Sequence, residues 1–261
     1  MRVMVSALAI LGALLALWQA VVTLTGVPPF LLPGPARVAR TLVERHELIL
    51  EHLGTTATEI VLGLVIGTLL GCASAIAIHA LPMARRVGLP LLVASQAVPV
   101  FALAPLLVLW LGYGMESKIA MAVLIIFFPV ATAFLDGLRR TDRGHLELAG
   151  VMLAGRGWRA RWAILRHVRI PAALPALGSG LRVAAGVAPI GAVIGEWVGS
   201  GAGLGYLMLH ANGRMQVDLM FAALFVLAAF AVLLWFAVDR GIRLLLPWQP
   251  DSFSEPGETE K

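Results

Sequence analysis

Three ionisable residues lie inside long apolar stretches of this chain and are the first candidates for chemistry: Glu59, Arg182 and Glu196. Charged groups in such stretches are costly to bury, and in membrane proteins they often serve proton or ion relays. Glu59 and Glu196 fall near the ends of their stretches, which favours snorkelling toward water or a packing role. The weak charge at the centre therefore counts against an ion-coupled secondary transporter without excluding it.

The chain carries no familiar catalytic motif beside these residues. It has neither HExxH nor GxSxG, its six histidines are scattered, and the single Cys72 can form neither an internal disulfide nor a cysteine zinc cluster. A P-loop needs Gly-Lys-Ser/Thr, whereas the two lysines, Lys118 and Lys261, each follow another residue type. We therefore expect no catalytic site, metal or cofactor, which disfavours a membrane enzyme, and any ATP-driven work must come from a partner.

The composition indicates a membrane protein. Of 261 residues, 59% are hydrophobic and 13% are charged, and the mean hydropathy is +0.89. Soluble domains carry about 25% charged residues, so a standard cytosolic enzyme, a disordered chain and a disulfide-rich secreted module are excluded. An isoelectric point near 10.3 suggests nucleic-acid binding in a soluble protein. Here the basic residues lie between apolar blocks, so we expect a lipid bilayer and no nucleic acid as the partner.

Six apolar stretches are long enough to cross a bilayer, which takes about 20 residues. The predicted fold is an all-α polytopic membrane protein whose transmembrane domain covers residues 1–246, followed by a flexible cytoplasmic tail at 247–261. The first stretch is expected to remain as an uncleaved helix. The six predicted spans are 3–24, 55–80, 89–111, 119–138, 172–198 and 219–238.

The distribution of basic residues predicts the orientation of these spans. With the N-terminus inside, the inner segments hold fourteen Lys and Arg residues and the outer segments hold five. This asymmetry follows the positive-inside rule and places both termini in the cytoplasm. The one large inner segment, 139–171, carries eight of the arginines.

Small residues and prolines predict how the spans pack and bend. Gly63, Gly67 and Gly71 form a doubled GxxxG pattern that lets another helix approach closely. Prolines bend the third span, and the fifth span is rich in glycine, which suits a moving element or pore wall as well as plain close packing. The polar or bent positions of these two spans are our pore candidates: Gln96, Pro99, Ser179, Arg182, Pro189 and Glu196.

The large inner segment contains a recognisable pattern, which begins Glu147-Leu148-Ala149-Gly150 and ends Val168-Arg169-Ile170-Pro171. It resembles the EAA loop of bacterial ABC import permeases. Three further stretches, at residues 30–38, 99–119 and 195–206, are similar to segments of the nitrate/sulfonate/taurine branch of that family. The four stretches occur in the expected order and on the expected sides of the membrane.

The resemblance implies a type I ABC importer permease with six transmembrane helices. In that family the EAA loop forms a coupling helix that sits in a cleft of the cytoplasmic ATPase. The match departs from the family at Leu153, where a glycine is usual, and the interval to Pro171 is longer. We therefore expect a short insertion within residues 153–162, with Gly155 or Gly157 in place of the turn glycine. The predicted ATPase-coupling residues are Glu147, Leu148, Ala149, Gly150, Ala154, Gly155, Gly157, Trp158 and Pro171.

The resemblance also implies the setting of the protein. A permease of this type forms its pore with a second permease copy in the bacterial cytoplasmic (inner) membrane, receives its solute from an extracytoplasmic substrate-binding protein, and relies on cytoplasmic ABC ATPase subunits. Residues 187–197 and 207–212 look most like permeases for pyrimidine-type thiamine precursors, with sulfonate, taurine or nitrate as other possible substrates. A stand-alone ion-coupled secondary transporter is the alternative.

Overall fold

The computed structural model describes residues 2–95, 97–155 and 157–248 of the chain. These residues form helices and connecting turns, with no strand among them. In chain order the elements are α1 Arg2–Thr25, α2 Pro35–Glu44, α3 His46–Ala80, α4 Pro82–Ala94, α5 Val100–Leu111, α6 Met115–Arg139, α7 Arg143–Met152, α8 Trp158–Ile164, the π-helical turn η1 Leu165–Arg169, α9 Ile170–Gly199, α10 Leu204–Gly213 and α11 Val217–Leu245.

Four helical segments are long and apolar enough to cross a membrane. They are α3, α6, the continuous segment Trp158–Gly199 that contains α8, η1 and α9, and α11. The apolar part of α1, Ala9–Thr25, and α5 are shorter apolar helices. This all-helical architecture confirms the predicted fold class.

The predicted third span, 89–111, is not one helix. The chain forms α4 and α5 instead, with a break between Ser95 and Pro99. Pro99 has an extended backbone (φ −60°, ψ 115°) and precedes the first residue of α5. Proline disfavours helical geometry in the residue before it and donates no backbone hydrogen bond, so a helix ends more readily here than it bends. The predicted bend is thus a break.

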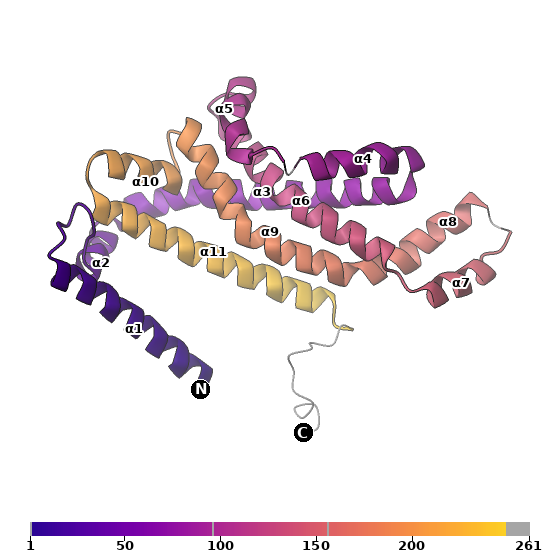
Figure 1. Ribbon diagram of the computed structural model, residues 1–261, viewed down its shortest axis with the longest axis horizontal. Helices are drawn as coiled ribbons and strands as arrows, with labels where there is room; N and C mark the ends of the chain where they lie inside the picture. Colours follow the sequence, from indigo (N-terminus) through magenta and orange to yellow (C-terminus); the bar gives the residue numbers. More distant parts are fainter. Residues whose placement is uncertain (1, 96, 156, 249–261) are drawn as a thin grey trace.

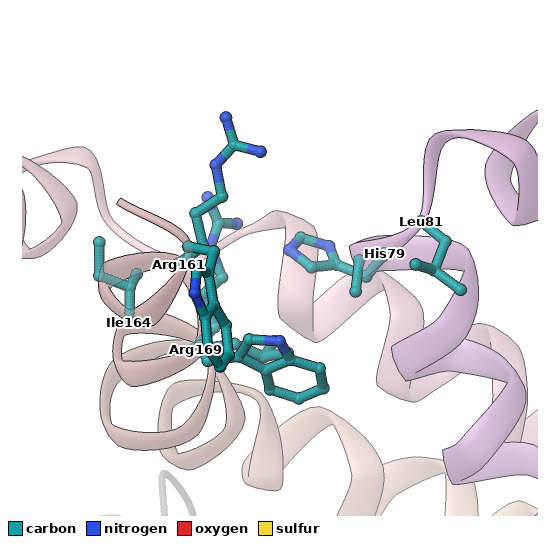
Figure 2. A pocket seen from close by; sticks show the side chains of 9 residues that line it. His79, Leu81, Arg161, Ile164 and Arg169 are labelled. Atoms are coloured by element: carbon teal, nitrogen blue, oxygen red, sulfur yellow. The ribbon is translucent and has the colours of Figure 1, made fainter. Parts of the chain in front are cut away.

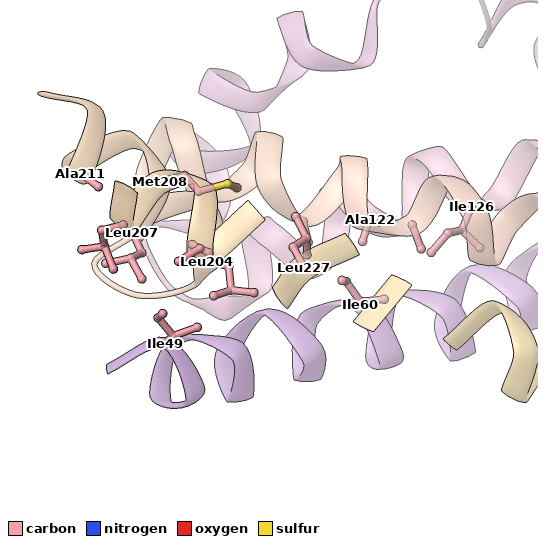
Figure 3. Packing of buried hydrophobic residues seen from close by; sticks show 14 of the residues in the cluster. Ile49, Ile60, Ala122, Ile126, Leu204, Leu207, Met208, Ala211 and Leu227 are labelled. Atoms are coloured by element: carbon pink, nitrogen blue, oxygen red, sulfur yellow. The ribbon is translucent and has the colours of Figure 1, made fainter. Parts of the chain in front are cut away.

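The glycines of α3 lie against α6, as the doubled GxxxG pattern predicts. A Cβ atom added to Gly63 would lie 2.5 Å from Ala122 Cβ, and one added to Gly67 would lie 2.7 Å from Ile126 Cγ2. Because these distances are shorter than van der Waals contact, only glycine permits this backbone approach. The neighbouring core contains Ile60, Ala122, Ile126 and Leu227 from three helices (Figure 3).

Small residues also line the contact between α9 and α6. A Cβ atom added to Gly191 would lie 2.8 Å from Ala122 Cα, and one added to Gly180 would lie 2.8 Å from the carbonyl oxygen of Pro129. Ala184 and Ala188 are fully buried. Close packing is therefore the observed role of many small residues in α9.

The bundle has two distinct ends (Figure 1). The α7–α8 segment projects at the end where α3 stops, whereas α2 and α10 lie at the opposite end. The α1 helix leans away from the bundle, and Trp18 attaches it to α11 by stacking on Phe221 with ring centroids 5.8 Å apart. Much of the α1 surface is apolar and exposed, including Leu14 and Leu17.

Candidate functional site

The predicted coupling segment forms a short helix outside the bundle. Asp142 begins α7 because its carboxylate accepts hydrogen bonds from the backbone N–H groups of Gly144 (2.8 Å) and His145 (3.2 Å). Ala149 is the one buried residue of α7. Glu147 and Gly150 are exposed, and Leu148 is exposed by 61%. Two further apolar side chains, Val151 and Met152, are exposed on the same helix by 77% and 73%.

A turn built on glycine joins α7 to α8. Ala154 and Gly155 follow the end of α7, and Gly157 precedes α8. Gly155 has φ +82° and Gly157 has φ +55°, which are backbone conformations that residues with a side chain rarely adopt. The sequence interval that departs from the family pattern therefore contains two backbone conformations that favour glycine. Trp158 opens α8 and is exposed by 68%.

The α8 helix continues without interruption into α9 through a π-helical turn. The N–H of Ile170 bonds to the carbonyl of Leu165 in this turn. Pro171 follows directly in the first turn of α9. A proline inside a helix lacks a donor and crowds the carbonyl four residues earlier, and a wider π turn relieves that crowding. Pro171 is thus accommodated within one 42-residue segment that links the α7–α8 turn to the membrane.

Of the pore candidates, Ser179 lies on an open groove between α6 and α9. The groove has a volume of about 610 Å³ and is mostly apolar. Thr132 and Asp136 of α6 and Ser179 of α9 are polar residues that line it, and Phe128 is its aromatic wall. Within the residues that the structure describes, this face of α9 is left uncovered.

The other pore candidates lie elsewhere. Gln96 falls outside the described residues, Pro99 lies at the α4–α5 break, and Pro189 is buried within α9. Arg182 Nε donates to Asp239 Oδ1 of α11 at 2.6 Å, and Asp239 Oδ2 accepts from Arg243 Nε at 2.8 Å. Arg182 therefore joins α9 to α11. The structure does not bring Pro99, Arg182 or Pro189 together with Ser179 in one site.

Glu196 and Glu59 do not reach toward water, contrary to the snorkelling interpretation. Each residue is exposed by only 1%. Glu196 Oε1 accepts a hydrogen bond from Thr56 Oγ1 at 2.6 Å, and Glu196 Oε2 accepts from the backbone N–H groups of Gly205 and Tyr206. Glu59 lies beside Glu196 and near Lys118, and its Oε2 makes no hydrogen bond within the described part of the chain.

Two residues of this network escaped the sequence reasoning. Thr56 accepts the N–H of Leu204 at 2.7 Å, and His52 Nδ1 accepts the N–H of Gly203 at 2.9 Å. Both lie in α3, one and two helical turns before Glu59. This spacing places them on the helix face that carries Glu59, and it is the sequence signal that could have identified them. Together with Glu196 they hold the start of α10 against α3 and tie three elements at one end of the bundle.

Comparison with protein families identifies the family to which this chain belongs. Residues 60–249 match the family described as the binding-protein-dependent transport system inner membrane component. The chain belongs to this family. It is a permease subunit of an ABC importer, of the nitrate/sulfonate/taurine type that the sequence motifs predicted.

Similar permeases cover nearly the whole chain. A probable ABC transporter permease protein of Haemophilus influenzae is 53% identical over 232 residues, which are 89% of this chain and 93% of that one. The formylaminopyrimidine transport permease protein ThiX of Halalkalibacterium halodurans is 35% identical over 237 residues, with 90% of this chain and 92% of that one covered. These relatives are permease subunits and not ATPases, which supports a non-enzymatic role for this permease and does not favour a stand-alone secondary transporter.

A solved structure confirms the fold of the permease. The inward-facing MetNI methionine ABC transporter contains a chain that superposes with a TM-score of 0.65 at 20% identity, covering 77% of this permease and 98% of that chain. The permease is therefore a multi-pass membrane protein with the helical architecture of an ABC importer subunit.

Proposed function

We propose that this permease couples to a cytoplasmic ABC ATPase through α7. The observation that carries the proposal is the exposure of Leu148, Val151 and Met152 on a helix that projects from the end of the bundle. Exposed apolar side chains on such a projection are typical of a protein interface. The position of the EAA-like sequence on this same helix supports the assignment.

The proposed mechanism is alternating access driven by the ATPase. ATP closes the ATPase dimer and draws two α7 helices together. Because α8 continues into α9 as one segment, a displacement of the α7–α8 turn is passed to α9 as a rigid-body movement. The permease then opens toward the opposite side of the bacterial cytoplasmic membrane.

We assign the wall of the solute pathway to the groove between α6 and α9. Ser179, Thr132 and Asp136 offer hydrogen bonds along a mostly apolar surface, as small-molecule sites commonly do. A second copy of the permease, facing this groove, completes the pore. A substrate-binding protein delivers the solute at the end formed by α2 and α10.

We propose a pyrimidine-type thiamine precursor as the solute, ahead of a sulfonate, taurine or nitrate. The similarity to the formylaminopyrimidine permease ThiX supports this choice. So does the resemblance of residues 187–197 and 207–212 to permeases for such precursors.

The coupling proposal is tested by purification of the permease from native membranes in mild detergent, with mass spectrometry of the proteins that accompany it. A P-loop ATPase in near-stoichiometric amount is the expected result. Leu148→Asp should remove the ATPase, whereas Leu31→Asp, at an equally exposed leucine (64%) before α2, should retain it. A permease that purifies alone and moves solute in liposomes under an ion gradient contradicts the proposal.

The substrate proposal needs a separate measurement. Uptake of a labelled aminopyrimidine precursor by cells that express the complete transporter should be blocked by excess unlabelled precursor and not by taurine or nitrate. Uptake of labelled taurine, with no uptake of the labelled pyrimidine, would assign the protein to the sulfonate group and leave the coupling proposal intact.

A further inference from the structure

A second cavity lies between the end of α3 and the α8–η1 segment. Its volume is about 410 Å³. His79 and Leu81 form one wall, and Arg161, Trp162 and Arg169 belong to the other. Figure 2 shows the His79 ring extending into the space toward the wall that carries Arg161 and Arg169. The described lining contains none of the exposed apolar residues of α7, and Trp158 is the one predicted coupling residue that it includes.

Among the described residues, the charged side chains that line this cavity are all basic. The electrostatic neighbours of His79 are Arg169, Arg139 and Arg85. Arg169 Nη1 donates to the carbonyl oxygen of Leu138 at 3.0 Å, which leaves its other donors available. Among the described residues, no carboxylate lies within ion-pair distance of Arg161 or Arg169. Within the described part of the chain, the positive charge therefore has no counter-ion.

The same cavity has an aromatic and apolar rim. Trp158 and Trp162 are exposed by 68% and 56%, and Leu81 is exposed by 56%. Tryptophan and arginine are the residues that gather where a membrane surface meets water. The cavity opens at the end of the bundle where the arginine distribution predicts the cytoplasmic leaflet, whose anionic lipids attract basic groups.

We propose that this cavity binds the headgroup of an anionic phospholipid of the cytoplasmic leaflet. The phosphate interacts with Arg161, Arg169 and His79, and the glycerol and upper acyl chain pack on Trp162 and Leu81. Basic pockets between membrane helices on this side are suited to such headgroups. Because the two walls come from α3 and α8, a bound lipid fastens the coupling segment to the bundle, and this role is independent of which solute is carried.

The test uses the purified full-length permease in detergent, with native mass spectrometry to count bound lipids. Phosphatidylglycerol and phosphatidylcholine of the same acyl chains are the probes. The wild-type protein should prefer phosphatidylglycerol, and Arg161→Gln should weaken that binding about fivefold, since one arginine near a lipid surface contributes about that factor. Arg166→Gln is the matched control, because Arg166 is exposed on η1 and does not line the cavity.

Three results would overturn the proposal. One is equal retention of both lipids by the wild-type protein, a measurement that needs no variant to fold. Another is equal phosphatidylglycerol binding by Arg161→Gln and Arg166→Gln. The third is displacement of phosphatidylglycerol by millimolar inorganic phosphate, which would identify a soluble phosphate as the ligand. If the permease purified from native membranes without an ATPase but still preferred phosphatidylglycerol, the proposed function alone would be refuted.

Discussion

Thr56 of α3 donates a hydrogen bond of 2.6 Å to Glu196 of α9, although 140 residues separate them in the sequence. The same hydroxyl accepts the N–H of Leu204 at the start of α10. One threonine therefore connects three helices, and its bond to a buried carboxyl group stabilises the end of the bundle opposite α7.

Thr56→Ala should destabilise the protein by about 1–3 kcal/mol, because it leaves a buried carboxyl oxygen and a buried backbone N–H without a partner. Thermal unfolding of the detergent-purified protein measures the loss. Thr58→Ala is the control, since Thr58 is exposed and bonds only to Gly54 of its own helix. Equal unfolding temperatures for the two variants would show that the Thr56 bond is dispensable.

Gly63→Ala should separate α3 from α6. The added Cβ would lie 2.5 Å from Ala122 Cβ, which is attached directly to a buried backbone and cannot rotate away. Overpacking of this kind costs about 1–3 kcal/mol, visible as a lower unfolding temperature and a loss of monodisperse protein.

Gly54→Ala, in the same helix, is the matched control for that variant. A Cβ at Gly54 would meet no atom within 4 Å, and alanine favours the helix by up to about 1 kcal/mol. If Gly63→Ala were as stable as Gly54→Ala, the close approach of α3 and α6 would be wrong.

Arg182 and Asp239 should show energetic coupling. Their side chains meet at 2.6 Å between α9 and α11. A double-mutant cycle with Arg182→Gln and Asp239→Asn should give a coupling energy of about 0.5–3 kcal/mol, as contacting residues do. The cycle of Arg182→Gln with Glu116→Gln, an exposed residue at the start of α6, should be additive. Additivity in the first cycle would show that the Arg182–Asp239 ion pair does not contribute to stability.

Gly157→Ala should impair coupling more than it impairs folding. Gly157 has φ +55° and ψ −127°, a conformation that costs a residue with a side chain about 1–3 kcal/mol. The turn would relax to another geometry and move α7, so ATPase association and uptake should fall by more than the unfolding temperature. Gly241→Ala is the control, because Gly241 is helical, lies in α11 outside the proposed contact, and a Cβ there meets no atom within 4 Å. Normal uptake by Gly157→Ala would show that this turn does not place α7.

The apolar stretches were predictable because bilayer length and hydropathy act along a single segment of chain. The α3 glycines were predictable for the same reason, since their spacing of four residues places them on one helix face. The predicted third span shows what local sequence does not determine. Three prolines predict an irregular helix between residues 89 and 111. Only the observed geometry distinguishes a bent helix from the break that separates α4 and α5.

The candidate site divides in a similar way. The EAA-like sequence indicated the segment that forms α7, but it did not indicate how exposed that helix is. The roles of the residues predicted for coupling stay predictions. The pore candidates came from polarity alone, and polarity does not reveal which face of a helix a residue occupies. Ser179 lies on the α6–α9 groove, whereas Arg182, one helical turn later, pairs with Asp239.

The sequence by itself determined that this is a helical membrane protein similar to import permeases, which segments are apolar, and where the EAA-like segment lies. These properties depend on composition, on local periodicity and on short motifs. Only the tertiary structure decided that Glu196 is buried against Thr56, that His52 holds Gly203, and that basic residues from two segments enclose one cavity. The physical reason is that each of these contacts joins helices distant in the chain, and their register is set by the packing of the whole bundle.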